Sequence, residues 1–332
     1  MRLTSLLLTL AGLVIVVAVP GSPRSFAAEP PPEIPAWLRA HVGDGDGRIS
    51  QVVLQRARAL YLQNPRKGAV SNPCYFAFDA TRPAGAGRRF YIICEGDRTF
   101  RAVSSGHGNG RSLNGTNFAN GLRCAKNFSN AEGSKLTTGG PYVTAETRPS
   151  FKGYYRAGGK RVPLVRSFLQ FEGEGDTANA RERAIGGHPA VLLRGLCRLK
   201  DPESPYKDKE GYVPYGKLVD YSAGRSNGCT SWTRAESEKI FEIVKDRPTT
   251  IYIYPESRDI DAVAQALKAG KSLSRAGLYW NASCLREIRV PKFWPKETLE
   301  PIIEAYRKAH PPPPPQPLPL CKGSEMSGAS SQ

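Results

Sequence analysis

The chain has 332 residues, of which 47 are Lys or Arg and 30 are Asp or Glu, so its formal net charge at pH 7 is +17. This length suffices for one large hydrophobic core or two small ones. A strongly basic exterior favours polyanionic partners such as nucleic acid, acidic lipid head groups or anionic envelope polymers. The basic residues are scattered and carry no aromatic-studded motif of the single-strand-binding kind, which argues against nucleic acid.

Residues 1–27 have the order of a secretory signal peptide. Arg2 is followed by an apolar run over residues 6–19 and by small residues up to Ala27, where we expect cleavage. The run is short for a bilayer span, which needs about 20 residues, so an uncleaved membrane anchor is the alternative interpretation. Cleavage removes Arg2 and Arg24 and no acid, which lowers the net charge from +17 to +15. We expect the protein in the periplasm or facing the cell wall, with anionic envelope polymers as partners and no nucleic acid.

Residues 28–70 are predicted to form a linker and one helix. The linker is rich in proline, and residues 49–62 repeat apolar side chains with helical periodicity, so we expect them to pack on the core. Residues 44–47, Asp-Gly-Asp-Gly, superficially suggest a calcium loop. The pattern fails because Ile49 stands at its glycine position and Gln55 at its closing glutamate position, so we predict no metal site there.

Residues 71–256 are predicted to form the main domain, which is rich in strands. Runs of β-branched and aromatic residues are bounded by Gly and Pro, and one helix is expected over residues 233–246 with Thr233 as its N-cap. Residues 199–215 are predicted to be an inserted loop, either a lid or a solvated insertion. The expected fold class is α+β and mainly β, a sandwich-like β core with peripheral helices. The predicted strands cover residues 75–78, 89–94, 142–147, 164–171, 184–188 and 250–254.

Residues 257–310 are predicted to be a helical extension, with helices over residues 259–269 and 296–309. The tail, residues 311–332, opens with a run of prolines that must be extended polyproline. It would either cross part of a cell wall or tether Cys321 to the body of the protein.

The chain contains seven cysteines, an odd number for an exported protein. Exported thiols are normally oxidised, so one cysteine stays unpaired if six form disulfides. Cys229 is the natural odd one, because it lies in the glycine-flanked turn of residues 224–230 and follows Arg225. The amides of Gly228 and Cys229 could bind an oxyanion, and Arg225 would lower the thiol pKa or hold a substrate carboxylate.

A cysteine nucleophile needs a base, and the chain offers four histidines. His41 lies by the N-terminal linker and His310 opens the proline tail, so neither is well placed on the β-rich domain. His188 ends a predicted strand and His107 lies in a glycine-rich loop, and catalytic side chains are commonly presented at such places. The residues alone leave open that Cys229 forms a disulfide and that His188 only packs.

A series of motifs in a fixed order spans residues 103–255. They are Gly106-His107-Gly108-Asn109-Gly110, Phe128-Ser129-Asn130 with Gly133-Ser134, Gly139 ahead of Thr144 and Glu146-Thr147, Asn179 with Arg183-Ala184-Ile185, His188, and Gly224-Arg225-Ser226-Asn227-Gly228-Cys229. In this order they resemble the murein L,D-transpeptidase catalytic domain, in its branch with an Arg-Ser-x-Gly-Cys signature. Ordered blocks across about half of the chain are more specific than the cysteine turn alone.

The resemblance implies a β-rich, sandwich-like domain with Cys229 as nucleophile and His188 as its base. In that family the thiolate attacks the carbonyl of the third, diamino-acid residue of a peptidoglycan stem peptide and releases the terminal D-Ala. The acyl group then passes to an amine. No metal or organic cofactor takes part.

The resemblance also assigns supporting roles around the nucleophile. Ser226, Asn227 and Gly228 would shape the turn and the oxyanion hole, and Arg225 would support the site. His107 would either line the substrate groove or only cap its glycine turn.

The chain departs from the family pattern on both sides of the proposed site. Pro189 stands after the base where a glycine is expected, and residues 230–232, Thr-Ser-Trp, replace the usual Pro-Ala after the cysteine. Both changes leave nucleophile and base intact, and we expect them to reshape the acceptor side.

Six cysteines remain for disulfides and permit fifteen pairings. We expect Cys124 to pair with Cys197, because both fall in family-variable stretches. The other expected pairs are Cys74 with Cys94 on neighbouring strands and Cys284 with Cys321, which would tie down the tail.

Two alternative functions stay open. With water instead of an amine as acceptor, the same site would be an L,D-carboxypeptidase or another peptidoglycan hydrolase. A protein without activity would instead be a wall-binding module that uses its basic surface and proline tail.

Overall fold

The computed structural model describes residues 32–64, 68, 70–85, 87–113, 115–221 and 226–322. Among the sequence predictions, the signal peptide, Gly224, Arg225 and residues 323–332 of the tail lie outside the described residues.

The described residues form six α-helices, one 3-10 turn and fourteen strands. The helices are α1 (Ala36–Arg39), α2 (Gln51–Gln63), the 3-10 turn η2 (Gly175–Thr177), α3 (Arg234–Val244), α4 (Ser257–Lys268), α5 (Ala282–Ile288) and α6 (Lys296–Ala309). The strands are β1 (Cys74–Asp79), β2 (Arg88–Cys94), β3 (Thr99–Ser104), β4 (Ser112–Leu113), β5 (Thr116–Asn117), β6 (Asn127–Ser129), β7 (Gly140–Ala157), β8 (Lys160–Gly173), β9 (Gly186–Pro189), β10 (Val191–Lys200), β11 (Tyr212–Asp220), β12 (Thr230–Trp232), β13 (Thr250–Tyr254) and β14 (Lys292–Trp294). The predicted class, α+β and mainly β, is confirmed.

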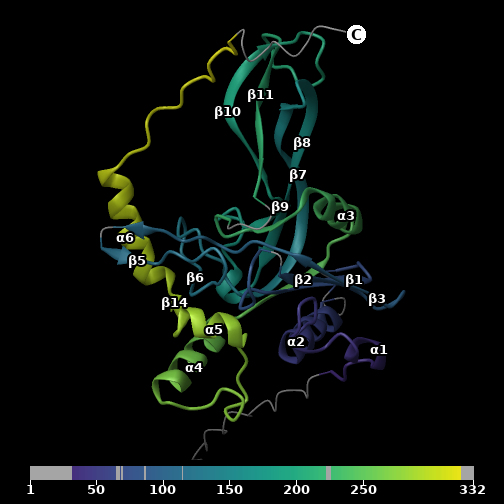
Figure 1. Ribbon diagram of the computed structural model, residues 1–332, viewed down its shortest axis with the longest axis vertical. Coiled ribbons are helices and arrows are strands. Elements are labelled where there is room, and N and C mark those ends of the chain that lie inside the picture. The colour runs from purple at the N-terminus through teal and green to yellow at the C-terminus, as the bar shows by residue number, and fades with distance from the viewer. Residues whose placement is uncertain are drawn as a thin grey trace, which may run out of the picture. The chain divides into compact units, whose positions relative to one another are not determined.

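The central element is a mixed sheet of ten strands in the order β12-β9-β8-β7-β13-β1-β2-β3, with β11 joined to β7 and β10 to β11. The inner part of β7 pairs with β13, and its outer part pairs with β11. The β7–β8 hairpin therefore continues beyond the core. We call β10, β11 and residues 149–167 of this hairpin the arm; Figure 1 shows its four strands running together away from the other strands.

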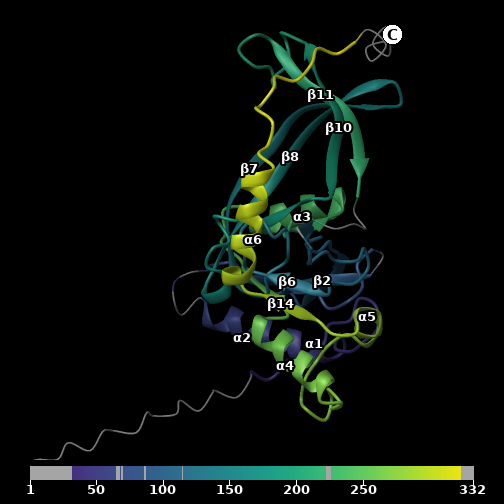
Figure 2. The ribbon, with the colours of Figure 1, turned by 90° about the vertical axis from the view of Figure 1, so that its left-hand side faces the viewer.

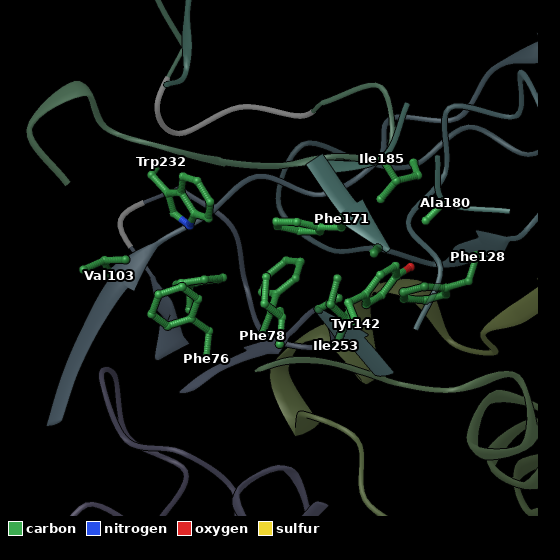
Figure 3. Packing of buried hydrophobic residues seen from close by; sticks show 14 of the residues in the cluster. Phe76, Phe78, Val103, Phe128, Tyr142, Phe171, Ala180, Ile185, Trp232 and Ile253 are labelled. Atoms are coloured by element: carbon green, nitrogen blue, oxygen red, sulfur yellow. The ribbon is translucent and has the colours of Figure 1, made fainter. Parts of the chain in front are cut away.

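Strand β1 is buried along most of its length because the sheet is covered on both faces. Phe76 and Phe78 point into the main hydrophobic cluster, whereas Tyr75 and Ala77 point into a second cluster under α1 and α2. This division follows from the two-residue period of a strand. Figure 3 shows the main cluster, in which Trp232 lies near the two phenylalanines.

Several predicted elements match the structure closely, and two need correction. The strand over residues 250–254 and the helix over residues 296–309 are confirmed residue for residue. The strand predicted over residues 184–188 begins only at Gly186, because Ala184 has a φ of 50° and cannot belong to a strand. The predicted inserted loop is wrong at both ends, since residues 199–200 belong to β10 and residues 212–215 to β11.

The α3 helix begins where the sequence predicts. The backbone N–H of Glu236 donates to the Thr233 side chain over 3.2 Å, which is the predicted N-cap. In α2 the backbone N–H of Val53 likewise donates to Ser50. This cap explains why α2 starts at Gln51 rather than at the predicted Ile49.

Three disulfides join six of the seven cysteines. The Cys74–Cys94 pair is confirmed, and these residues lie directly opposite each other on β1 and β2. The other two predicted pairs are wrong, because Cys124 and Cys284 meet in the main cluster while Cys197 lies at the end of the arm. The observed pairs are Cys124–Cys284 and Cys197–Cys321.

The disulfides bear on where the protein folds. Three bridges are typical of an exported protein that folds in an oxidising compartment. Among the described residues, no helix combines the length and the apolarity needed to cross a bilayer.

The proline-rich tail is fastened to the arm. Residues 311–320 run as an extended strap from α6 to the arm, as both ribbon views show (Figures 1 and 2). Leu320 forms a parallel bridge with Arg198, and the backbone N–H of Arg198 donates to the carbonyl of Pro319 over 2.7 Å. The tail thus tethers Cys321 as one of the two sequence hypotheses proposed, with Cys197 as its partner.

Candidate active site

Two neighbouring strands, β9 and β12, bring Cys229 and His188 together. The strands are parallel, with Thr230 opposite Gly187 and Ser231 opposite His188. Cys229 precedes β12, so the same register places it beside Gly186, two residues before His188 on the neighbouring strand. Side chains two residues apart on a strand point to the same face, so the thiol and the imidazole lie on one side of the sheet.

Cys229 and His188 line the same groove, which has a volume of about 920 Å³. Both are largely buried, with 8% of Cys229 and 7% of His188 exposed. Arg166 and Arg183 also line the groove, and neither has a carboxylate partner among the described residues. The apolar wall comes from β8 and β10 and includes Leu164, Phe168 and Leu193.

The turn before Cys229 is held by Ser226. Its hydroxyl donates to the carbonyl of Cys229 and accepts a hydrogen bond from the N–H of Gly228 over 3.2 Å. Gly228 has a φ of +110°, and a Cβ atom there would lie 2.9 Å from the carbonyl oxygen of Leu136, so no other residue fits without a shift. The expectation that the Gly228 amide binds an oxyanion is wrong in this geometry, because that donor is already used.

Asn227 is exposed and lines the groove, as its place in the turn predicts. Its side chain is therefore available to a bound substrate. Arg225 lies outside the described residues, so its predicted support of the thiol stays a prediction.

His107 is fully buried and is not among the residues that line the groove. Its Nε2 lies 3.0 Å from the carbonyl oxygen of Gly121, which can only accept, so Nε2 carries the proton. Its Nδ1 then accepts from Arg89 over 2.8 Å. The backbone carbonyl of His107 accepts from the N–H of Ser226 over 2.7 Å. His107 therefore does not line the groove as described, which leaves the turn-capping role of the two proposed, and its loop supports the cysteine turn.

Nδ1 of His188 has two neighbours with opposite requirements. Arg166 Nη2 lies 2.9 Å away and can only donate, and the carbonyl oxygen of Pro189 lies 3.0 Å away and can only accept. Arg166 is fixed by hydrogen bonds to the carbonyl of Val191 and to Ser150. Nε2 can accept a proton from a reacting group in the tautomer whose Nδ1 carries the ring hydrogen and donates it to the carbonyl oxygen of Pro189. In the other tautomer Nδ1 accepts from Arg166 and Nε2 holds the proton.

Burial and the charge of Arg166 lower the pKa of His188 to about 4, partly offset by the hydrogen bond to Pro189. The imidazole is therefore neutral at physiological pH, as a general base must be. Burial raises the pKa of the Cys229 thiol, while a backbone hydrogen bond from Gly186 and the charges of Arg166 and Arg183 act in the opposite direction. The resting site is thus a protonated thiol beside a neutral imidazole.

The thiol is oriented by the backbone that precedes β9. Cys229 Sγ lies 3.4 Å from the carbonyl oxygen of Ala184, to which the S–H donates. The left-handed conformation of Ala184 turns this carbonyl toward the thiol side of the sheet. A group held in this way keeps its proton until a stronger acceptor or an electrophile arrives.

Residues 230–232, which follow the cysteine, belong to the core of the sheet. They form β12, and all three side chains are buried. Trp232 packs edge-on against Phe90 with ring centroids 5.0 Å apart, and a Cβ atom on Gly187 would lie 2.0 Å from the indole. The segment thus supports the strand of His188 through Trp232, and its expected effect on the acceptor side stays a prediction.

Arg166 was not among the predicted site residues. The signal was present in the alternation Leu164, Arg166, Phe168, which puts a cation in an otherwise apolar row on one face of β8. Arg183 was noted only as part of a matching block. Its guanidinium donates to the carbonyl of Leu136 over 2.8 Å, so it also fixes the segment that contacts Gly228.

Comparison with known proteins adds no assignment. No protein-family model matches the chain, and no curated protein is significantly similar to it.

Proposed function

We propose that the protein is an exported cysteine L,D-transpeptidase that cross-links or remodels peptidoglycan stem peptides through a thioester on Cys229, in the periplasm or facing the cell wall. The observation that carries the proposal is the redox state of the cysteines. Six are joined in disulfides, and the seventh, Cys229, stays reduced in a groove that it shares with a neutral histidine. In a chain that oxidises its other thiols, a free thiol at such a place is best explained by its use as a nucleophile.

The reaction uses the two side chains in turn. As Sγ of Cys229 attacks the carbonyl carbon between the third stem residue and the terminal D-Ala, its proton passes to Nε2 of His188. The C–N bond then breaks, the leaving amine takes that proton, and a thioester remains. The acceptor amine gives a proton to His188 as it attacks the thioester carbon, and the departing thiolate recovers the proton.

The oxyanion of each tetrahedral intermediate needs donors other than Gly228. The N–H of Cys229 itself and the exposed amide of Asn227 are the proposed donors, because both lie in the turn that leads into the groove. The guanidinium groups of Arg166 and Arg183 add positive charge to the same groove, which suits a substrate that carries carboxylates.

The test is incubation of the purified protein with muropeptides that bear tetrapeptide stems, with products identified by mass spectrometry. Cross-linked dimers and free D-Ala are expected, whereas tripeptides alone would identify a hydrolase that uses water. Cys229→Ala should lower the rate by at least about 10³-fold, because the nucleophile is lost. Full activity of that variant would overturn the proposal.

A matched pair of histidine variants tests the base. His188→Ala should lose activity, whereas His310→Ala should not, since His310 is exposed and stacks on Tyr306 at the end of α6. A carbapenem, which acylates members of the family that the chain resembles, should add its mass to Cys229. An unmodified Cys229 under these conditions would favour the inactive wall-binding module instead.

A further inference from the structure

The arm carries a row of four cations in register across four adjacent strands. Arg194 on β10 lies opposite Lys217 on β11, Lys217 opposite Arg156 on β7, and Arg156 opposite Arg161 on β8. Residues directly opposite each other point to the same face of a sheet, so the four side chains lie side by side. All four residues are exposed. We call them the cation row.

The row is not explained by the stability of the fold. Like charges directly opposite each other on neighbouring strands are destabilising. Arg161 has an ion pair with Asp201 at 3.2 Å, but the other three have no carboxylate within ion-pair distance in the described part of the chain. Arg88, an exposed arginine on β2, by contrast contacts Asp46 at 3.0 Å.

The three unpaired cations line a hollow of about 430 Å³ on the arm. Gly195 and Gly216 also line it and add no side chain to its floor. With strands about 4.8 Å apart, the three charges span about 10 Å, which matches several anionic groups along a chain rather than one small anion.

Arg194 connects the hollow to the groove of Cys229, because it lines both. Apart from Arg194, the hollow and the groove lie on opposite faces of the arm. Phe151 and Arg166 line the groove, and each stands five residues from a member of the cation row on its strand, Arg156 or Arg161. An odd separation along a strand places two side chains on opposite faces. A β-bulge follows Arg194 and bends β10 there, which puts its side chain at the rim of both.

We propose that the cation row is a binding site for a linear polymer that bears carboxylates, and that this polymer is a peptidoglycan strand whose stem peptides reach the groove around Arg194. The identity of the polymer rests on the proposed function; the anion-binding row does not. Arg presents a planar fork of donors that fits carboxylates, and the Lys adds a mobile charge between the two arginines.

The experiment is co-sedimentation of the full-length mature protein with purified, insoluble peptidoglycan. Arg156→Gln/Lys217→Gln removes two row charges and spares Arg194, while Lys268→Gln/Lys271→Gln removes two exposed charges at the end of α4 as the matched control. We expect the row variant to bind about tenfold more weakly and the control variant to bind like the unmodified protein. Equal binding by the two variants would overturn the proposal.

A chemically modified polymer tests which anionic groups the cation row binds. Peptidoglycan whose carboxylates have been converted to amides should bind the unmodified protein as weakly as native peptidoglycan binds the row variant. Undiminished binding to the amidated polymer, together with competition by polyphosphate, would overturn the choice of carboxylates. Thermal unfolding guards against misfolding, because relief of like-charge contacts should leave the melting temperature of the row variant unchanged or higher.

The two proposals fail in distinguishable ways. If the cation row does not bind peptidoglycan, Cys229 still turns over small soluble muropeptides, and both double variants sediment alike. If the transpeptidase proposal is wrong, those muropeptides stay intact while the row variant still binds anionic peptidoglycan less tightly than the control. With both correct, the row variant keeps its rate on small muropeptides and slows only on the insoluble polymer.

Discussion

Every residue of β9 and β12 is buried, whereas exposed residues interrupt the buried ones along β10 and β11. The first region is fixed by the main cluster and by Trp232. The second is fixed by strand pairing, the strap and the Cys197–Cys321 disulfide. The nucleophile and base lie in the first region, and much of the groove wall comes from the second.

This division separates two requirements of a transfer enzyme. Thiol and imidazole must be held within tenths of an ångström, which close packing provides. A polymeric substrate must be able to enter and leave the groove. A groove wall that is held by strand pairing and by a strap at its end allows this. The comparison predicts that equal chemical changes cost very different amounts of stability in the two regions.

The largest effect is expected at Trp232. Trp232→Ala leaves a cavity under β9 and should lower the free energy of unfolding by about 4 kcal/mol, measured by urea titration. Activity at low denaturant should fall too, since His188 loses its support. Trp232→Phe keeps an aromatic ring against Phe90 and should lose clearly less stability than Trp232→Ala. A loss below about 1 kcal/mol for the alanine variant would show that this region is not the rigid one.

The next effect concerns pH and His188. In the folded protein its pKa is about 4, whereas an unfolded histidine titrates near about 6.5, so the unfolded state binds more protons between these values. Stability should therefore fall as the pH drops from about 6.5 to about 4, by up to about 3 kcal/mol from this group.

Two measurements check this prediction. An NMR titration should place the midpoint of His188 well below that of an unfolded peptide, and Arg166→Met should raise it, because one of the two causes of the shift is removed. In the His188→Gln variant, the decrease in the free energy of unfolding between about pH 6.5 and about pH 4 should be smaller by the contribution of His188, about 3 kcal/mol. A midpoint near about 6.5 in the unmodified protein would contradict a buried, neutral base.

The two long-range disulfides give a third comparison. They close separations of 160 and 124 residues, so chain entropy alone predicts losses that differ by only about 0.2 kcal/mol. We expect a larger difference, with Cys124→Ser/Cys284→Ser costing about 2 kcal/mol more than Cys197→Ser/Cys321→Ser. Without the Cys197–Cys321 bridge, the strap becomes mobile while the rest of the protein stays folded, and this gain in entropy offsets part of the loss. Residues 124 and 284 stay packed in the main cluster without their bridge, so no such gain offsets that loss.

Hydrogen exchange separates these cases. The Cys197→Ser/Cys321→Ser variant should exchange faster only in β10 and β11, and the core strands should keep their protection. Equal losses in unfolding experiments, with protection lost throughout, would mean that arm and core unfold as one unit.

How far the sequence predicts the molecule follows the same division. Core strands such as β13 and the cap at Thr233 were predicted because local patterns specify them. Most of the arm carried no strand prediction, because its exposed positions carry Lys and Arg, which conceal alternation. Only residues 199–200 of β10 and 212–215 of β11 fell within the predicted loop. Residue types and the family resemblance together predicted Cys229 and His188 as the site, and the structure places both in one groove. Arg166 contacts His188 across 22 positions of sequence, and only folding shows such a contact.

The smallest effect is expected on the outer part of β8. Val165 is 45% exposed, so Val165→Ala removes little buried surface and should change the free energy of unfolding by less than about 0.5 kcal/mol. Leu169, on the same strand but within the main cluster, is fully buried and provides the matched control. Leu169→Ala should cost about 3 kcal/mol in the same urea titration. If Val165→Ala cost as much, the arm would be packed as closely as the core, and its proposed freedom to admit a polymer would lose its physical basis.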